Sequence, residues 1–390
     1  MSFCLQLGHS DQAFGLSDMV QRTAAGPTMG AQTISTRRKT MTTYDIALIG
    51  FGGVNRTLAQ LIHDRGDSLK SELGFGLRVV AITDLRLGSL VKDGGIDLSM
   101  ALRLGGGSDT FADHGGSVTP DNEHVIRTCS ADIVCEATFT NPEDGEPAVS
   151  HVRWALESGK SVCTTNKGPV ALRGPELTAL AERNGVRFEF EGAVMSGTPV
   201  IRLARKMFAG LRLAGFEGIL NGTSNYVLGR METGMELGKA IAEAQELGYA
   251  EANPAADIEG FDVQLKVLIL ANELLGAGIS LSDVTRRGIS ELSAKEVKNA
   301  ALAGRRWKLV GSAKRNPDGT VSAGVEPVAL PLGHGLAGVS GATNAVSFTT
   351  DLLGPVTVSG PGAGRVETAY ALLSDIIAIH AAKAGVAAHA

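Results

Sequence analysis

YDIALIGFGGVNRTLAQLI, residues 44–62, is the stretch that decides the fold. The apolar run at 46–49 predicts a buried parallel strand. A glycine turn follows at 50–53, and apolar residues at 54, 58, 61 and 62 have the spacing of one helix face. The stretch therefore predicts a strand, a tight turn and a helix in direct succession.

The glycine turn resembles a dinucleotide-binding fingerprint. Such a turn needs a first glycine for the bend, a second for close approach to a pyrophosphate, and a small third residue for packing. Gly50 and Gly52 meet the first two requirements, and Asn55 departs from the third. Because the turn opens a helix, phosphates would bind at the helix N-terminus. A purely structural turn is the alternative.

The same alternation of strands and helices continues along the chain. We expect strands at 77–84, 131–138, 161–165 and 186–194, with helices around 148–158 and 174–184. This order predicts an α/β fold with a Rossmann-type doubly wound parallel sheet. After Pro199 the helices lengthen and the strands between them predict a separate sheet. A long amphipathic helix near the end is expected to return to the first domain.

We therefore expect four segments. Residues 1–40 lack a periodic pattern and are expected to be a disordered tail or sequence upstream of the true start. Residues 41–195 form the nucleotide-binding domain, 196–345 an α/β catalytic and dimerisation domain, and 346–390 a C-terminal segment that packs on the first domain.

Composition indicates a soluble cytoplasmic protein. The chain is 44% hydrophobic and 20% charged, which is ordinary for a globular protein. A net charge of −5 gives no reason to expect nucleic acid or a membrane surface as a partner. No apolar run approaches the roughly 20 residues that span a bilayer. The four cysteines form no C-x-x-C pair, and the eight histidines lack metal-ligand spacing, so we expect reduced thiols and no zinc site.

The second strand leaves the choice of cofactor open. Asp84 ends it, and an acid there usually binds the ribose hydroxyls of NAD. Arg86 and Lys92 follow, and a basic group can accept the 2′-phosphate of NADP. A solvated loop is the alternative for both basic residues.

Three further turns carry polar side chains. Asn166 and Lys167 follow a predicted parallel strand, and that end of a sheet is where ligands bind. EGAVMSGTPV at 191–200 offers one carboxylate and several carbonyl oxygens, which suit a monovalent cation; a plain strand-to-helix turn is the alternative. NGTSNYVL at 221–228 offers small donors that suit a carboxylate.

The stretch ANPAADIEGFDVQLKV, residues 252–267, carries acids and a lysine into an apolar segment. Asp257 is expected to cap the following helix. Asp262 and Lys266 are four apart and share a helix face. Because the helix is apolar nearly all round, we expect both charges to be partly buried, which marks a functional site. Burial would lower the pKa of Lys266, whereas the negative charge of Asp262 would raise the pKa of this lysine. The sequence leaves open which effect is larger. Glu251 adds a carboxylate just upstream.

In this order, the glycine turn, TTNKGP, EGAVMSGTP, NGTSNYVL, GYAEANPAADIEGFDVQLK and SGPGAG resemble the homoserine dehydrogenase family. The resemblance covers residues 44–385, and the 251–266 block is its most specific part. It is similar to the short, monofunctional form without an ACT domain. It implies interconversion of L-homoserine and L-aspartate 4-semialdehyde with NADP or NAD, in threonine and methionine biosynthesis, by a cytoplasmic homodimer.

The resemblance also implies residue roles. Lys266 would be the proton donor or acceptor, with Lys167 and Asp262 as further catalytic residues. Substrate-binding residues would be Glu251, Asp262, Asp257, Tyr249 and Thr223. Cofactor-binding residues would be Gly50, Gly52, Gly53, Val54, Asp84, Arg86, Thr138, Lys167, Gly248, Glu251, Gly362 and Gly364. A sodium ion would be held by Glu191, Val194, Ser196 and Thr198.

Two other functions compete with this one. A phosphorylating semialdehyde dehydrogenase would need an activated cysteine, for which Cys135 and Cys163 are the candidates. A non-catalytic nucleotide sensor would not need Asp262 and Lys266 together on an apolar helix.

Overall fold

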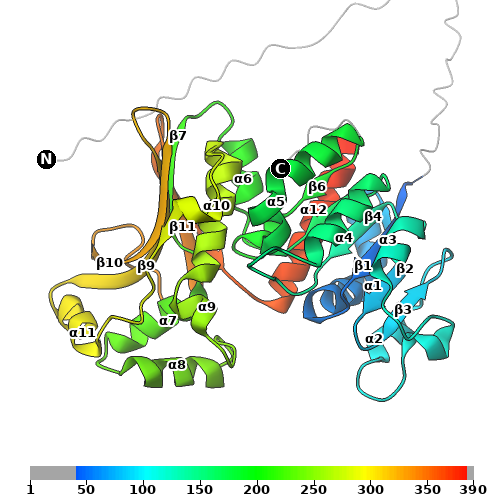
Figure 1. The fold of residues 1–390 in the computed structure, drawn as a ribbon, viewed down its shortest axis with the longest axis horizontal. Coiled ribbons are helices and arrows are strands. Elements are labelled where there is room, and N and C mark those ends of the chain that lie inside the picture. Colours follow the sequence, from blue (N-terminus) through cyan, green and yellow to red (C-terminus); the bar gives the residue numbers. More distant parts are fainter. Residues whose placement is uncertain (1–40, 384–390) are drawn as a thin grey trace, which may run out of the picture. The chain divides into compact units, whose positions relative to one another are not determined.

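The computed structural model describes residues 41–383, so the expectation for residues 1–40 lies outside it. Within 41–383 the chain forms two six-stranded sheets (Figure 1). No helix in this range is long and apolar enough to cross a membrane.

The first sheet has the strand order β3-β2-β1-β4-β5-β6. Its strands are β1 (Thr43–Ile49), β2 (Gly76–Asp84), β3 (Gly88–Val91), β4 (Ile133–Glu136), β5 (Ser161–Thr164) and β6 (Phe188–Glu189). All neighbours are parallel except β2 and β3. The chain leaves β1 for β2 on one side and later adds β4 on the other. The carboxyl ends of β1 and β4 therefore form a topological switch point, where such sheets bind ligands.

Helices cover this sheet, and the last of them forms the C-terminal end of the described chain. They are α1 (Gly53–Leu73), α2 (Leu98–Arg103), α3 (Asn122–Thr128), α4 (Ala148–Glu157), α5 (Lys167–Arg183) and α12 (Arg365–Lys383), with a 3₁₀ turn at Phe111–His114. α12, red in Figure 1, packs against α1. Leu372 and Ile376 of α12 share an apolar core with Leu48 and Leu58. The predicted doubly wound α/β fold with a returning C-terminal helix is confirmed.

The second sheet has the order β12-β11-β7-β9-β10-β8 and is antiparallel except between β8 and β10. Its strands are β7 (Leu213–Ile219), β8 (Val284–Arg286), β9 (Arg305–Arg315), β10 (Val321–Pro331), β11 (Thr343–Thr350) and β12 (Gly354–Pro361). The sheet thus continues past the boundary expected at residue 345.

The helices of this part are α6 (Ile201–Met207), α7 (Gly222–Met231), α8 (Leu237–Glu246), α9 (Ala255–Ile258), α10 (Phe261–Leu275) and α11 (Ala294–Leu302). A 3₁₀ turn at Leu281–Asp283 precedes β8. α10 contacts β7, β8, β9 and β10. It lies close to β9 because Gly311 leaves room: a Cβ there would lie 2.6 Å from Cγ2 of Val267. The face of α10 that carries Val263 and Val267 is therefore buried in the core.

Two predicted elements have different bounds in the structure. The helix expected at 174–184 begins at Lys167, because the Asn166 side chain accepts a hydrogen bond from Gly168 N and caps it. Pro175 lies inside this helix and does not start it. The strand expected at 186–194 is only two residues long, and a 3₁₀ turn at Glu191–Ala193 follows it.

Candidate active site

The buried ion pair expected on α10 is present. Lys266 is 5% exposed. Its Nζ donates hydrogen bonds to Asp262 Oδ2 at 2.7 Å and to the main-chain oxygen of Leu220 at 2.6 Å. Lys167 Nζ, at the start of α5, lies 3.3 Å from Asp262 Oδ1. One carboxylate thus bridges two lysines that come from elements beside different sheets.

Asn221 holds a second carboxylate next to this pair. Its Nδ2 donates to Asp257 Oδ1 at 2.6 Å and to Asp262 Oδ2 at 2.9 Å. The Asn221 side-chain oxygen accepts from Ser224 N and caps α7. The sequence predicted that Asp257 caps α10, and this is wrong, because Asp257 lies within α9. Gly260, with φ 80°, ends that turn and precedes α10.

The pKa shifts of these groups follow from burial and neighbouring charge. Burial lowers the pKa of Lys266 more than the charge of Asp262 raises it, and the nearby Lys167 lowers it further. Burial alone would raise the pKa of Asp262, but Lys266, Lys167 and the Asn221 hydrogen bond together hold it well below its ordinary value. Burial and then the Asp262 charge raise the pKa of Asp257.

These groups line a cleft of about 2040 Å³. Many of the residues expected at the site from the sequence lie on its wall: Lys167, Thr223, Gly248, Tyr249, Glu251, Asp257, Asp262, Lys266, Gly362 and Gly364. The Thr223 hydroxyl donates to the main-chain oxygen of Tyr249 and ties the α7 turn to the α8–α9 connection. Glu251 is exposed at this wall. The cleft therefore brings both predicted substrate turns together with the two lysines.

The glycine turn lies at the switch point of the first sheet. Gly50 has φ 81°, and a Cβ there would lie 2.9 Å from the Thr138 methyl group, so glycine is required. Gly52 caps α1 without a side-chain hydrogen bond. Asn55, the departure from the fingerprint, is fully buried, and its amide donates to the main-chain oxygens of Ile49, Gly50 and Cys135. Asparagine here joins the ends of β1 and β4.

The turn after β2 presents both an acid and a base. Asp84 Oδ1 accepts hydrogen bonds from the backbone N–H groups of Arg86 and Leu87 at 2.9 and 3.1 Å. The Arg86 side chain is exposed, and Arg56 donates to main-chain oxygens at 102 and 104 nearby. The second oxygen of Asp84 accepts no hydrogen bond from the described residues.

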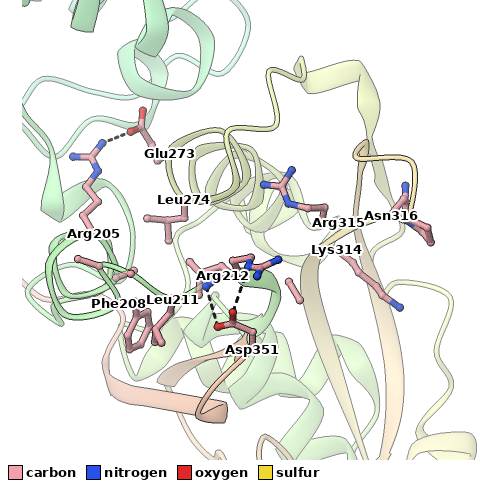
Figure 2. A pocket seen from close by; sticks show the side chains of 16 residues that line it. Arg205, Phe208, Leu211, Arg212, Glu273, Leu274, Lys314, Arg315, Asn316 and Asp351 are labelled. Carbon is pink, nitrogen blue, oxygen red and sulfur yellow. Dashed lines mark hydrogen bonds and ion pairs between the residues drawn. The ribbon is translucent and has the colours of Figure 1, made fainter.

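A second, smaller cavity of about 740 Å³ lies away from these groups (Figure 2). Its acids are already paired with arginines, Arg205 with Glu273 and Arg212 with Asp351. The Arg212 side chain is 93% exposed. The cavity therefore lacks the buried, converging polar groups of the main cleft.

Comparisons with known proteins agree with this geometry. The homoserine dehydrogenase family model matches residues 199–377. An NAD(+)-dependent homoserine dehydrogenase of Pseudomonas canavaninivorans is 60% identical over 341 residues, 87% of this chain and 97% of the relative. The chain belongs to the homoserine dehydrogenase family. It is therefore an oxidoreductase.

Other members extend the likeness. The homoserine dehydrogenase of Methanocaldococcus jannaschii is 38% identical, over 86% of this chain and 98% of the relative. The solved homoserine dehydrogenase from Thiobacillus denitrificans has a TM-score of 0.76 at 32% identity, over 90% of this chain and 76% of that one. A hyperthermophilic archaeal homoserine dehydrogenase in complex with NADPH has a TM-score of 0.73 at 29% identity, over 87% and 98%.

The thiols do not fit the competing cysteine-dependent dehydrogenase. Cys135 and Cys163 are fully buried in adjacent strands. Burial raises the pKa of the Cys163 thiol well above its ordinary value, and Cys135 raises it further. A thiol that resists ionisation is a poor nucleophile.

The turn at 191–198, at which the sequence led us to expect sodium, is held by several hydrogen bonds. Glu191 is buried, and its carboxylate accepts hydrogen bonds from the backbone N–H groups of Val200, Ile201 and Arg202. Ser196 has φ 53°, and its hydroxyl contacts that of Thr368 at 2.7 Å. The Thr198 hydroxyl donates to the main-chain oxygen of Pro361, and Val194 is buried.

Two residues at the site were missed from the sequence. Asn221 stood in the quoted turn, but its contact with both aspartates depends on the approach of α7 to α10. Arg365 opens α12, and a Cβ on Gly53 would lie 3.2 Å from its Nε. Within residues 41–383 its guanidinium makes no hydrogen bond or ion pair. A basic residue directly after a glycine turn was the available signal.

Proposed function

We propose that this member of the family interconverts L-homoserine and L-aspartate 4-semialdehyde, with Lys266 transferring the proton. The observation that carries the proposal is a lysine that is nearly fully buried, opens onto the cleft and is paired with Asp262. A bound nicotinamide supplies the acceptor or donor of hydride. In the oxidation, neutral Lys266 accepts the proton of the substrate hydroxyl. In the reduction, its ammonium form stabilises the developing alkoxide and protonates it.

The acids around the lysine suit the other end of the substrate. Asp257, Asp262 and Glu251 line the same wall and attract the α-ammonium group of homoserine. The turn with Thr223 offers backbone N–H groups to the α-carboxylate, while the Thr223 hydroxyl holds the turn against the main-chain oxygen of Tyr249. Lys167 neutralises part of the Asp262 charge and would lie toward the nicotinamide and the reacting carbon. Tyr249 lines the same cleft and would lie close to the substrate.

We propose NAD as the preferred cofactor. Gly50, Gly52, Gly53 and Val54 would approach the pyrophosphate, and a Cβ at Gly50 would collide with Thr138, which supports close backbone packing there. Asp84 has an uncommitted oxygen for the ribose diol. The 60% identical relative is named as NAD(+)-dependent. Arg86 is the residue that would favour NADP instead. Gly248, Gly362 and Gly364 line the cleft and would contact the cofactor.

Steady-state rates on L-homoserine with each cofactor test both proposals. We expect a higher kcat/KM with NAD than with NADP. Absence of NAD(P)H formation from homoserine would contradict the activity, whereas faster turnover with NADP would contradict only the cofactor preference.

We also propose a sodium ion at the 191–198 turn. Within the described residues, no hydrogen bond to the main-chain oxygens of Val194, Ser196 and Thr198 is recorded. Glu191 Oε2 accepts a single backbone hydrogen bond and lies 3.9 Å from the Arg202 guanidinium, so it keeps a lone pair for a cation. This donor set suits a hard cation. A sodium-dependent rise in the melting temperature, absent when lithium or choline replaces sodium at equal ionic strength, would support this site.

The assembly and location are proposals as well. We propose a cytoplasmic homodimer in amino-acid biosynthesis, with residues 196–361 as the catalytic and dimerisation domain and residues 41–195 with 362–383 as the nucleotide domain. β12 lies at the edge of the second sheet, and its residues alternate between half-buried and exposed. Such an edge is a ready surface for association. Light scattering of the purified protein gives the mass that decides this.

A further inference from the structure

Glu136 is a fully buried carboxylate at the ligand-binding edge of the first sheet. It is the last residue of β4 and has no exposed surface. A buried charge requires hydrogen-bond donors. Its Oε1 accepts from Thr138 N at 3.0 Å and from the Thr138 hydroxyl, and its Oε2 accepts from the Thr164 hydroxyl at 2.9 Å. All three donors lie at or just beyond the carboxyl ends of β4 and β5.

These bonds belong to a closed ring. The Thr164 hydroxyl accepts from Asn166 N at 3.1 Å. The Asn166 amide donates to the main-chain oxygens of Thr138 at 3.3 Å and Phe139 at 2.9 Å, which returns the path to the loop after β4. The ring therefore joins the loop after β4 to the loop after β5.

Each side of the ring touches a group of the proposed reaction. On one side, the Thr138 methyl group and the main-chain oxygen of Ala137 pack against Gly50 of the glycine turn. On the other side, Asn166 caps α5, so that Lys167 begins that helix 3.3 Å from Asp262. A displacement of either loop would move the cofactor turn relative to the lysines.

The ring suits a carboxylate. Thr138 donates its N–H and its hydroxyl to Oε1, and the Thr164 hydroxyl lies 2.9 Å from Oε2 and 3.1 Å from the Glu136 main-chain oxygen, so a side chain with two accepting oxygens receives both threonines. Glutamine would turn an N–H₂ group toward one hydroxyl. His151 Nδ1 lies 3.6 Å from Glu136 Oε1 and has no hydrogen-bond partner within residues 41–383. The imidazole thus lies next to the carboxylate but is too far away to replace the hydrogen bonds from the two threonines.

We propose that Glu136 is a positioning residue for hydride transfer, because its ring holds the Thr138 and Lys167 loops in register. The inference rests on the proposed roles of Thr138 and Lys167. It predicts that weakening the ring slows the chemical step more than it weakens binding of the cofactor.

The chain offers a matched set of variants. Thr164→Val removes one hydroxyl of the ring at nearly constant volume, and Thr164→Ser restores it. Glu136→Gln keeps the size of the side chain. Thr178→Val, on α5, removes a buried hydroxyl that has no hydrogen-bond partner within residues 41–383, and it serves as the control.

The readouts are kcat, the dissociation constant of NAD, and the isotope effect on kcat with homoserine deuterated at C4. Thr164→Val and Glu136→Gln are each expected to lower kcat about tenfold, as loss of a hydrogen bond to a charged group implies, and to raise the isotope effect. Thr164→Ser is expected to restore both, and Thr178→Val to leave them unchanged.

The opposite result is equally clear. A merely structural ring would lower the melting temperature of Thr164→Val and Glu136→Gln while kcat and the isotope effect stay at wild-type values, and this would overturn the proposal. Glu136→Gln decides if Thr164→Val does not fold. Failure of the wild-type protein to reduce NAD with homoserine would instead refute the proposed function, before any variant is compared.

Discussion

Replacing Lys266 with alanine tests the proposed chemistry most directly. A positioned acid–base group contributes roughly 10²–10⁴-fold to a rate, so we expect kcat to fall at least about 100-fold in both directions. The dissociation constant of NAD should change little, because the glycine turn lies on the first sheet and does not contact Lys266. The assay is NADH formation from homoserine, with cofactor binding followed by fluorescence.

The stability cost of this change follows from the contacts left behind. Breaking a buried ion pair costs about 3–5 kcal/mol. Asp262 keeps Lys167 at 3.3 Å and Asn221 at 2.9 Å, and its side chain is 16% exposed, so we expect the lower end, about 3 kcal/mol. Stabilities of native proteins are about 5–15 kcal/mol, and the variant should fold.

Lys308 provides the matched control. It is 3% exposed, burial lowers its pKa as it does for Lys266, and its Nζ donates to Asn225 Oδ1 and to the main-chain oxygen of Val339. Lys308→Ala should destabilise the fold while keeping turnover. If Lys266→Ala oxidised homoserine within about threefold of the wild-type rate, the role of Lys266 as proton acceptor would be refuted, since acid–base catalysis is worth far more.

Three further outcomes follow from the same contacts. Oxidation needs neutral Lys266, so kcat/KM should rise with pH through the lowered pKa of this lysine. Asp262→Asn removes a charge that raises this pKa, so the rising limb of the pH profile should move to lower pH. A move of that limb to higher pH would contradict the pairing of Lys266 with Asp262. Arg365→Ala should raise the KM for NAD about tenfold if the guanidinium contacts the pyrophosphate, whereas Arg65→Ala, farther along α1, should not; equal effects would point to net charge alone. Alkylation with iodoacetamide should leave turnover intact, because the described cysteines are buried, and inactivation that substrate prevents would revive a thiol mechanism.

The sequence supports the first sheet and the α10 pair because both depend on local pattern. Apolar runs that end in glycine turns are sufficient to predict parallel strands with ligands at their carboxyl ends. The spacing of Asp262 and Lys266 fixes a shared face, and the apolar neighbours require burial. The same local reasoning placed the cap of α10 at Asp257, because the left-handed turn at Gly260 has no signature beyond one glycine among many.

Other parts of the site depend on contacts between distant segments. Asn221 and Asp262 are 41 residues apart, and Arg365 lies over Gly53 because α12 packs on α1. Glu136 appears in the sequence as an ordinary end of a strand. Its role depends on the ring that β5 completes beside it. Periodicity and motif spacing do not predict these particular contacts.

The position of Asp262 between two lysines explains how one carboxylate can serve both protonation states of the reaction. When Lys266 gives up its proton, Asp262 still has Lys167 at 3.3 Å and the Asn221 amide at 2.9 Å, so the carboxylate is never left without a donor or cation. When Lys266 is protonated, Asp262 and the Leu220 oxygen accept from it and offset its burial. Because each state has compensating contacts, the free-energy difference between them is smaller than burial alone would set. A proton can then move in either direction at the cleft, as a reversible oxidation requires.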